Sequence, residues 1–245
     1  MISKRHFKIT TLLLLVVFVF GFHSNAQQRL LSDEGLSDQE KSIVKIASHT
    51  AQGNLVKLMD VLNEGLDNEL TVNETKEILV HLYAYAGFPR SIRGLQTLLK
   101  VLEERKSKGI GDDWGPEASP ISNSETKYER GKTILEELVG RPLEGKPDYQ
   151  KFSPEIDRFL KEHLFADVFE RDVLSYKQRE LVTISVIASL GALEPMLGSH
   201  YNLSLNVGWQ PEQLESFTQI IGTTAGKEKA KSALSVLGQI LKNRE

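Results

Sequence analysis

Two side chains with complementary proton chemistry, Glu180 and His200, stand within apolar helical patterns. Glu180 shares a helical stripe with Ile184 and Ile187, and His200 follows Met196 by one helical turn, so both are predicted to face inward. An apolar pocket disfavours the charged form of a carboxyl group, and a nearby carboxylate keeps an imidazole protonated. Such a couple can transfer protons near neutral pH, which is the chemistry of general acid–base catalysis.

The helices that carry this pair must bring it together. If they run antiparallel about a turn near Ala192, residue 204 is level with Glu180, and His200 is offset by four residues, or about 6 Å of helical rise. Packed helices lie about 8 to 10 Å apart, so the two side chains can meet or share a ligand. The alternative is a structural role: a buried pair whose two side chains only hydrogen-bond to each other, or a histidine hydrogen-bonded to a carbonyl group.

One helical unit occurs twice in the chain, and the pair breaks the equivalence of its copies. A shift of 138 positions aligns Leu36-Ser37 with Leu174-Ser175, Val44 with Val182, Ile46 with Ile184, Gly53 with Gly191, Leu55 with Leu193 and Glu74 with Glu212, and a shift of 139 aligns Ala86-Gly87 with Ala225-Gly226. In this alignment Glu180 replaces Ser42, and His200 replaces Leu62. Repeated units pack on one another because neither buries its apolar face alone. We therefore predict two similar halves packed as one body, with function in the second.

Apolar spacing predicts helices throughout both copies and no sustained strand, so we expect an all-α fold. The predicted first repeat spans residues 35–105: a hairpin of two helices between Ser37 and Leu66 around Gly53, a helix from Thr71 or Asn73 to Gly87, and a helix opened by Pro89. The predicted second repeat spans residues 153–240, with helices over 154–164, 175–190, 194–207 and 211–223.

Residues 106–152 form a predicted linker rich in Gly, Pro, Ser, Asp and Lys, with one short helix between Glu125 and Leu138. A connection of this length is uncommon inside a compact domain. We therefore expect it to wrap the surface or to reach a neighbouring subunit.

A second group of candidate residues is His81, Tyr85 and Arg90. His81 and Tyr85 are four residues apart on one helical face, and Arg90 follows a Gly-Phe-Pro turn, where a cation can be presented to a carboxylate ligand. These three are the predicted substrate-binding residues. The alternative is that Tyr85 belongs to the core and that Arg90 caps a helix or pairs locally.

The first 26 residues have the pattern of a cleavable signal peptide: three basic residues, an apolar run from Leu12 to Phe20, and Ser24-Asn25-Ala26. We expect cleavage near Ala26, a periplasmic or secreted protein, and no membrane association after the signal is removed. An uncleaved anchor is the alternative.

Composition excludes several classes of function. Without the predicted signal, 27 basic residues stand against 33 acidic residues, which argues against nucleic-acid binding. The chain contains no cysteine, which excludes thiol nucleophiles and thiolate metal ligands. Its histidines do not follow a metal-ligand spacing, and the phosphate-loop and serine-hydrolase motifs are absent. We expect neither a metal nor a cofactor.

Three motifs carry a family resemblance: Tyr85-Ala-Gly-Phe-Pro-Arg90, the Arg179-Glu180-Leu-Val-Thr-Ile run, and Ser199-His200 with Leu205-Asn206-Val-Gly208. Together they resemble the carboxymuconolactone decarboxylase family, over about residues 35–105 and 153–240. The resemblance implies an all-helical fold that assembles into homo-oligomers, often trimers or hexamers. It also implies one of two activities: decarboxylation of a carboxylated muconolactone, or peroxide reduction by a Cys-x-x-Cys pair in the alkylhydroperoxidase D-like branch.

The chain departs from the peroxidase branch, because the positions of its two cysteines, near Ala192 and Met196, hold no thiols. The predicted export also argues against the decarboxylase of aromatic catabolism, because that pathway operates in the cytoplasm. The leading hypothesis is therefore a periplasmic decarboxylase or lyase that acts on another small carboxylated or lactone-like compound. In it His200 protonates the carbanion or enolate, Glu180 orients His200, and Arg90 or Tyr85 holds a substrate carboxylate or carbonyl group. The alternatives are a non-catalytic exported oligomer that binds a small ligand or partner protein, and a purely structural duplicate.

Overall fold

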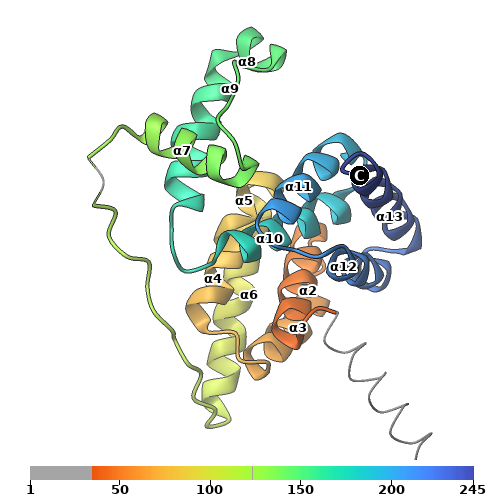
Figure 1. Cartoon of the computed structure of the whole chain (residues 1–245). Coiled ribbons are helices and arrows are strands. Elements are labelled where there is room, and N and C mark those ends of the chain that lie inside the picture. Colours follow the sequence, from red (N-terminus) through yellow and green to blue (C-terminus); the bar gives the residue numbers. More distant parts are fainter. Residues whose placement is uncertain (1–34, 123) are drawn as a thin grey trace, which may run out of the picture. The chain divides into compact units, whose positions relative to one another are not determined.

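Helices make up all the regular secondary structure in residues 35–122 and 124–245, which are the residues that the computed structural model describes (Figure 1). The predicted all-α class is confirmed. Leu36–Glu245 form one compact unit, and the predicted signal peptide lies outside the described residues. In the described part of the chain, no helix is both long and apolar enough to cross a membrane.

Capping boxes start three of the helices that matter for the site. Ser37, Thr71 and Ser175 each accept a hydrogen bond from the backbone three residues on, while the Glu or Gln there bonds back. They open α2 (Asp38–Gln52), α4 (Val72–His81) and α10 (Tyr176–Leu190). Side chains that satisfy these free N–H groups fix where each helix begins. The hairpin predicted from Ser37 onward does begin there, with Ser37 as the N-cap of α2.

The first half follows the predicted order with one correction. After α2, Gly53 ends the helix with a left-handed φ of 72°, and α3 (Leu55–Asp67) follows. The predicted continuous helix up to Gly87 is wrong, because the chain breaks at Leu82 into α4 and the single turn α5 (Tyr83–Ala86). The next helix, α6 (Phe88–Ser107), has Pro89 in its first turn as expected.

The linker carries more helix than predicted. It contains α7 (Lys127–Val139), close to the expected helix, and also α8 (Asp148–Phe152). After it, α9 (Pro154–Arg158) continues into the wider π-helix η1 (Phe159–Phe169). The loop before α7 lies on the start of α4, where Asp113 and Trp114 carbonyl groups accept the N–H groups of Val72 and Asn73. This part of the linker therefore wraps the surface.

The second half consists of α10, α11 (Glu194–Asn206), α12 (Pro211–Thr224) and α13 (Lys227–Lys242). The α13 segment was not predicted as a separate helix. All residues of α10 from Arg179 to Ser189 are buried. A helix covered on every side belongs to the centre of a core, so its polar residues are buried with its apolar ones.

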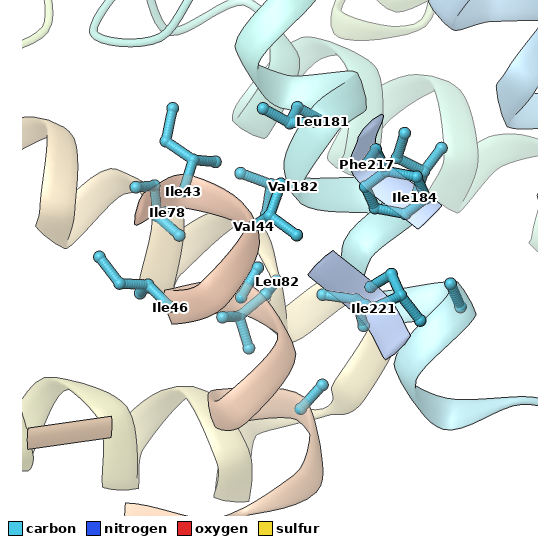
Figure 2. Packing of buried hydrophobic residues seen from close by; sticks show 14 of the residues in the cluster. Ile43, Val44, Ile46, Ile78, Leu82, Leu181, Val182, Ile184, Phe217 and Ile221 are labelled. Atoms are coloured by element: carbon cyan, nitrogen blue, oxygen red, sulfur yellow. The ribbon is translucent and has the colours of Figure 1, made fainter. Parts of the chain in front are cut away.

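The core forms where α10 packs against α2, with α12 and α4 beside them. Figure 2 shows Val44 of α2 beside Val182 of α10, with Leu82 and Ile221 nearby. Burial of each such side chain stabilises the fold by about 1.5–3 kcal/mol. The hydroxyl group of Ser189 also donates to that of Ser48 at 2.7 Å, which ties α10 to α2.

A second, smaller apolar cluster covers one end of α10. It is formed by α7 and η1 and consists of Ile134, Leu138, Phe165 and Phe169. Leu203 of α11 and Val207, directly after that helix, pack against it. Through this cluster the linker helix α7 packs against α10 and α11, the helices that carry Glu180 and His200.

Candidate functional site: a buried glutamate–histidine pair

Glu180 and His200 are in direct contact. Nδ1 of His200 lies 2.8 Å from Oε2 of Glu180, across the interface of α10 and α11. The Glu180 side chain is fully buried, whereas that of His200 is 16% exposed. Nε2 of His200 has no hydrogen-bond partner in the described part of the chain. The pair therefore has a buried acidic end and an imidazole nitrogen that is free to meet a ligand.

Tyr85 of α5 forms the adjacent wall. Its ring meets the His200 ring nearly at a right angle, with centroids 5.7 Å apart. Its hydroxyl group is buried without a hydrogen-bond partner, and so is the second carboxylate oxygen of Glu180, Oε1. Burial, and then the charge of Glu180, raise the pKa of Tyr85 well above its usual value, so the phenol stays protonated. Unpaired buried oxygens cost free energy, which a bound group that hydrogen-bonds to them would recover.

His81 lies behind Tyr85 and is already fully bonded to protein groups. Its Nε2 lies 2.9 Å from Oγ1 of Thr183, and a guanidinium nitrogen of Arg179 lies 3.3 Å from its Nδ1. Because a guanidinium group can only donate, Nδ1 must accept and Nε2 must carry the proton. Thr183 Oγ1 accepts a hydrogen bond from His81 Nε2–H and donates its own hydroxyl hydrogen to the Arg179 carbonyl group.

This arrangement keeps His81 neutral. Burial, then the charges of Arg179 and His200, hold the pKa of His81 well below its usual range. Both ring nitrogens are engaged, so His81 is placed to position its neighbours and has no free nitrogen for a substrate.

A buried charged group behind His81 was not predicted from the sequence. Arg179 is fully buried and donates to Glu77 Oε1 at 2.7 Å, while Arg171 binds the same carboxylate through two nitrogens, with Nε 2.9 Å from Oε1. The Arg179 guanidinium also donates to the Arg171 carbonyl group. The available signal was the placement of Glu77 and Arg179 within otherwise apolar helical stripes, the same signal that identified Glu180.

Arg90 lies elsewhere on the fold. It is exposed, and its guanidinium group covers Gly53 so closely that a Cβ atom there would stand 1.5 Å from its Nη1. Arg90 thus packs over the end of α2, and no described contact joins it to Glu180 or His200. Of the predicted site residues, the structure brings together Glu180, His200, Tyr85 and His81.

The groups at this site are those that proton transfer beside a hydrogen-bond donor would need. A carboxylate orients an imidazole, and a phenol stands next to both, within a buried setting. Among the described residues, no group of three or more His, Cys, Asp or Glu side chains is arranged to hold a metal ion.

A comparison with known proteins identifies the family of the half of the chain that contains this pair. Residues 154–239 match the model of the carboxymuconolactone decarboxylase family. This segment belongs to the carboxymuconolactone decarboxylase family. The match includes α10 and α11, and therefore both Glu180 and His200. The predicted first repeat, residues 35–105, lies outside it and stays a prediction.

A curated relative agrees with this carboxymuconolactone decarboxylase assignment. The chain is 26% identical over 126 residues to the 4-carboxymuconolactone decarboxylase of Acinetobacter baylyi, an alignment that covers 49% of this chain and 91% of the relative. Almost the whole relative thus corresponds to about half of this chain.

Proposed function

We propose that this protein is a cofactor-free decarboxylase or lyase that acts on a small carboxylated or lactone-like compound. The observation that carries the proposal is the contact between buried Glu180 and partly exposed His200, within a segment of the carboxymuconolactone decarboxylase family. The relative's printed activity is decarboxylation of such a lactone. A pair that can supply a proton next to a phenol fits this class of reaction.

In the proposed mechanism the substrate carries its own electron sink, a carbonyl group next to the carbon that bears the carboxylate. The carbon–carbon bond to the carboxylate breaks, carbon dioxide leaves, and the electron pair moves into the carbonyl group to give an enolate. The Tyr85 hydroxyl group, kept protonated by burial, donates a hydrogen bond to that oxygen.

His200 then completes the reaction. The protonated imidazole transfers its Nε2 proton to the carbanionic carbon, and solvent restores the proton. Glu180 accepts the Nδ1–H and fixes the orientation of the ring. His81, held by Thr183 and Arg179, supports Tyr85 from behind, with its ring centroid 5.6 Å from that of Tyr85. Arg90 has no role in this mechanism, because it packs over Gly53.

Screening for carbon dioxide release from panels of lactone carboxylates and keto acids tests the proposal. The expected result is release by the wild-type protein that His200→Ala abolishes without loss of fold. Equal activity of the variant would rule out the mechanism.

The second candidate function is non-catalytic binding of a small ligand or partner protein by the same site. The unpaired oxygens of Tyr85 and Glu180 favour a bound ligand whether or not it reacts. This function predicts thermal stabilisation by a compound from the same panels without any product.

Export and assembly are proposed separately. The basic and apolar pattern of residues 1–26 supports export to the periplasm or medium, and N-terminal sequencing of the secreted protein should place the cleavage near Ala26. The family assignment supports a homo-oligomer, with a trimer or hexamer as the expected mass in light scattering.

A further inference from the structure

A second cavity, of about 260 Å³, lies between α4, the linker and the turn that follows η1. A cavity that holds one water molecule needs only about 10–15 Å³, so this one can take a small organic molecule. Neither Glu180 nor His200 lines it. The cavity is therefore a separate candidate binding site.

The outer wall of this cavity is a strap of the linker, residues 115–119, that is fastened at both ends. The side-chain amide of Asn73 donates to the Gly115 carbonyl group at 3.0 Å, and the N–H group of Ser119 donates to Oδ1 of Asp172 at 2.8 Å. The strap residues that line the cavity lie between these two anchors. The wall is thus in place before any ligand binds.

Two cationic side chains of the wall have hydrogen-bond donors that no protein group uses. Arg171 is 39% exposed and binds Glu77 through Nε and Nη2, while its Nη1 has no partner among the described residues. The Lys76 ammonium group donates to Oδ1 of Asn73 at 2.8 Å, and no carboxylate in the described part of the chain pairs with it. A guanidinium group and an ammonium group on one wall are suited to bind a carboxylate.

The wall also contains two carboxylates, of which one is free. Glu77 is buried, and its two oxygens accept hydrogen bonds from Arg171 and Arg179. Glu117 belongs to the strap, and its carboxylate has no partner within the residues that the structure describes. The two cations and two carboxylates of the wall balance, so a ligand with one negative and one positive group matches it best.

The uncharged part of the wall suits an aliphatic group. It includes the side chains of Val80, Ala118 and Val173. Apolar side chains with a few well-placed polar groups are typical of sites for small ligands.

We propose that this cavity binds a free α-amino acid with a small aliphatic side chain. Nη1 of Arg171 and the Lys76 ammonium group donate to its carboxylate, and its ammonium group donates to Glu117. Its side chain packs against the apolar part of the wall. An α-amino acid carries these three groups on one carbon atom, which is why it fits a neutral wall with separated charges.

Three probes that share one carbon skeleton test this class: L-valine, isovalerate, which lacks the amino group, and isobutylamine, which lacks the carboxylate. Their dissociation constants are measured by ligand-observed NMR on the protein as purified. We expect valine to bind at least about tenfold more tightly than either of the others, since each of them loses a charge-assisted hydrogen bond.

Two substitutions locate the site. Glu117→Gln should weaken valine binding to the level of isovalerate, and Lys76→Gln should weaken both valine and isovalerate by at least about tenfold. Glu212→Gln, which removes a charge from the exposed first turn of α12, should leave all three affinities unchanged. His200→Ala should also leave them unchanged, because His200 does not line the cavity.

Equal binding of valine and isovalerate would reduce the cavity to a carboxylate site and overturn the inference, and so would no binding of valine. The inference also fails if Glu117→Gln binds valine as tightly as the wild-type protein does. Glu117 is exposed on a loop, so this variant is expected to fold. None of these measurements needs turnover, so their outcome is independent of the proposed decarboxylation.

Discussion

His200 Nδ1 lies 2.8 Å from Glu180 Oε2, and this contact joins a fully buried carboxylate to an imidazole that still reaches the surface. The buried acid fixes the ring through one nitrogen and leaves the other free. A structural pair and a catalytic pair share this geometry and differ in how activity and stability respond when either residue is replaced.

Replacing His200 removes the proposed proton donor. His200→Ala should lower turnover of any identified substrate by about 10²- to 10⁴-fold, the usual contribution of a general acid or base. Far-ultraviolet circular dichroism should be unchanged. Ser199→Ala, an exposed neighbour on α11, is the control and should retain full activity. Comparable activity in both variants would contradict the assignment.

The stability of the pair can be measured by a double-mutant cycle. His200→Leu alone leaves the buried Glu180 carboxylate unpaired and should destabilise the protein by about 3–5 kcal/mol in urea unfolding. Adding Glu180→Leu should recover about 1–3 kcal/mol of that loss. Both variants should lack activity. A double variant that is as stable as wild type and fully active would establish the purely structural reading.

His81 should stay neutral and carry its proton on Nε2. Nitrogen–proton correlation NMR should show this tautomer, because Arg179 donates to Nδ1. Burial and the charges of Arg179 and His200 lower the pKa of His81. As the pH falls through about 6.5, His81 therefore binds a proton in the unfolded chain but not in the folded protein. This group's contribution to stability is therefore complete above that pH and declines as the pH falls below it. An Nδ1–H tautomer would contradict the assigned network.

Asp157 should govern part of the acid stability. Burial would raise its pKa, but hydrogen bonds from Lys146, Lys161 and Tyr128 outweigh burial and lower the pKa to about 2. Its stabilising contribution is thus present above the unfolded value of 3.8 and is lost as the pH falls toward 2. Asp157→Asn should destabilise the protein at pH 7 by about 3–5 kcal/mol, since Lys161 is left buried without its partner. The variant should also lose stability less steeply between pH 4 and pH 2, and an unchanged slope there would refute this role.

Gly131 allows α7 to approach η1 closely. A Cβ atom at this position would stand 1.8 Å from the Lys161 carbonyl oxygen, a backbone atom. Gly131→Ala should therefore lower the free energy of unfolding by about 1–3 kcal/mol or more, as overpacking does. Gly238→Ala in α13 meets no atom within 4 Å and should stabilise the protein by up to about 1 kcal/mol through helix propensity. Thermal unfolding of both variants tests the contact.

Much of the fold could be predicted from local sequence. The spacing of apolar residues located most helices, and Ser37 marked a helix start, because capping and amphipathicity depend on residues within one or two turns. The break at Leu82 was missed, since α4 and α5 together have one continuous apolar pattern. The inward orientation of Glu180 followed from the same periodicity.

The sequence by itself determined that the chain is helical, that it contains no thiol, and that Glu180 and His200 lie in apolar stripes. Only the tertiary structure decided which groups meet. It fixed the His81 tautomer by placing Arg179 and Thr183 against a ring about one hundred residues away in sequence, and it placed Arg90 over Gly53. The physical reason is that hydrogen-bond partners so far apart in sequence are set by how α4 packs against α10, and local patterns do not encode that packing.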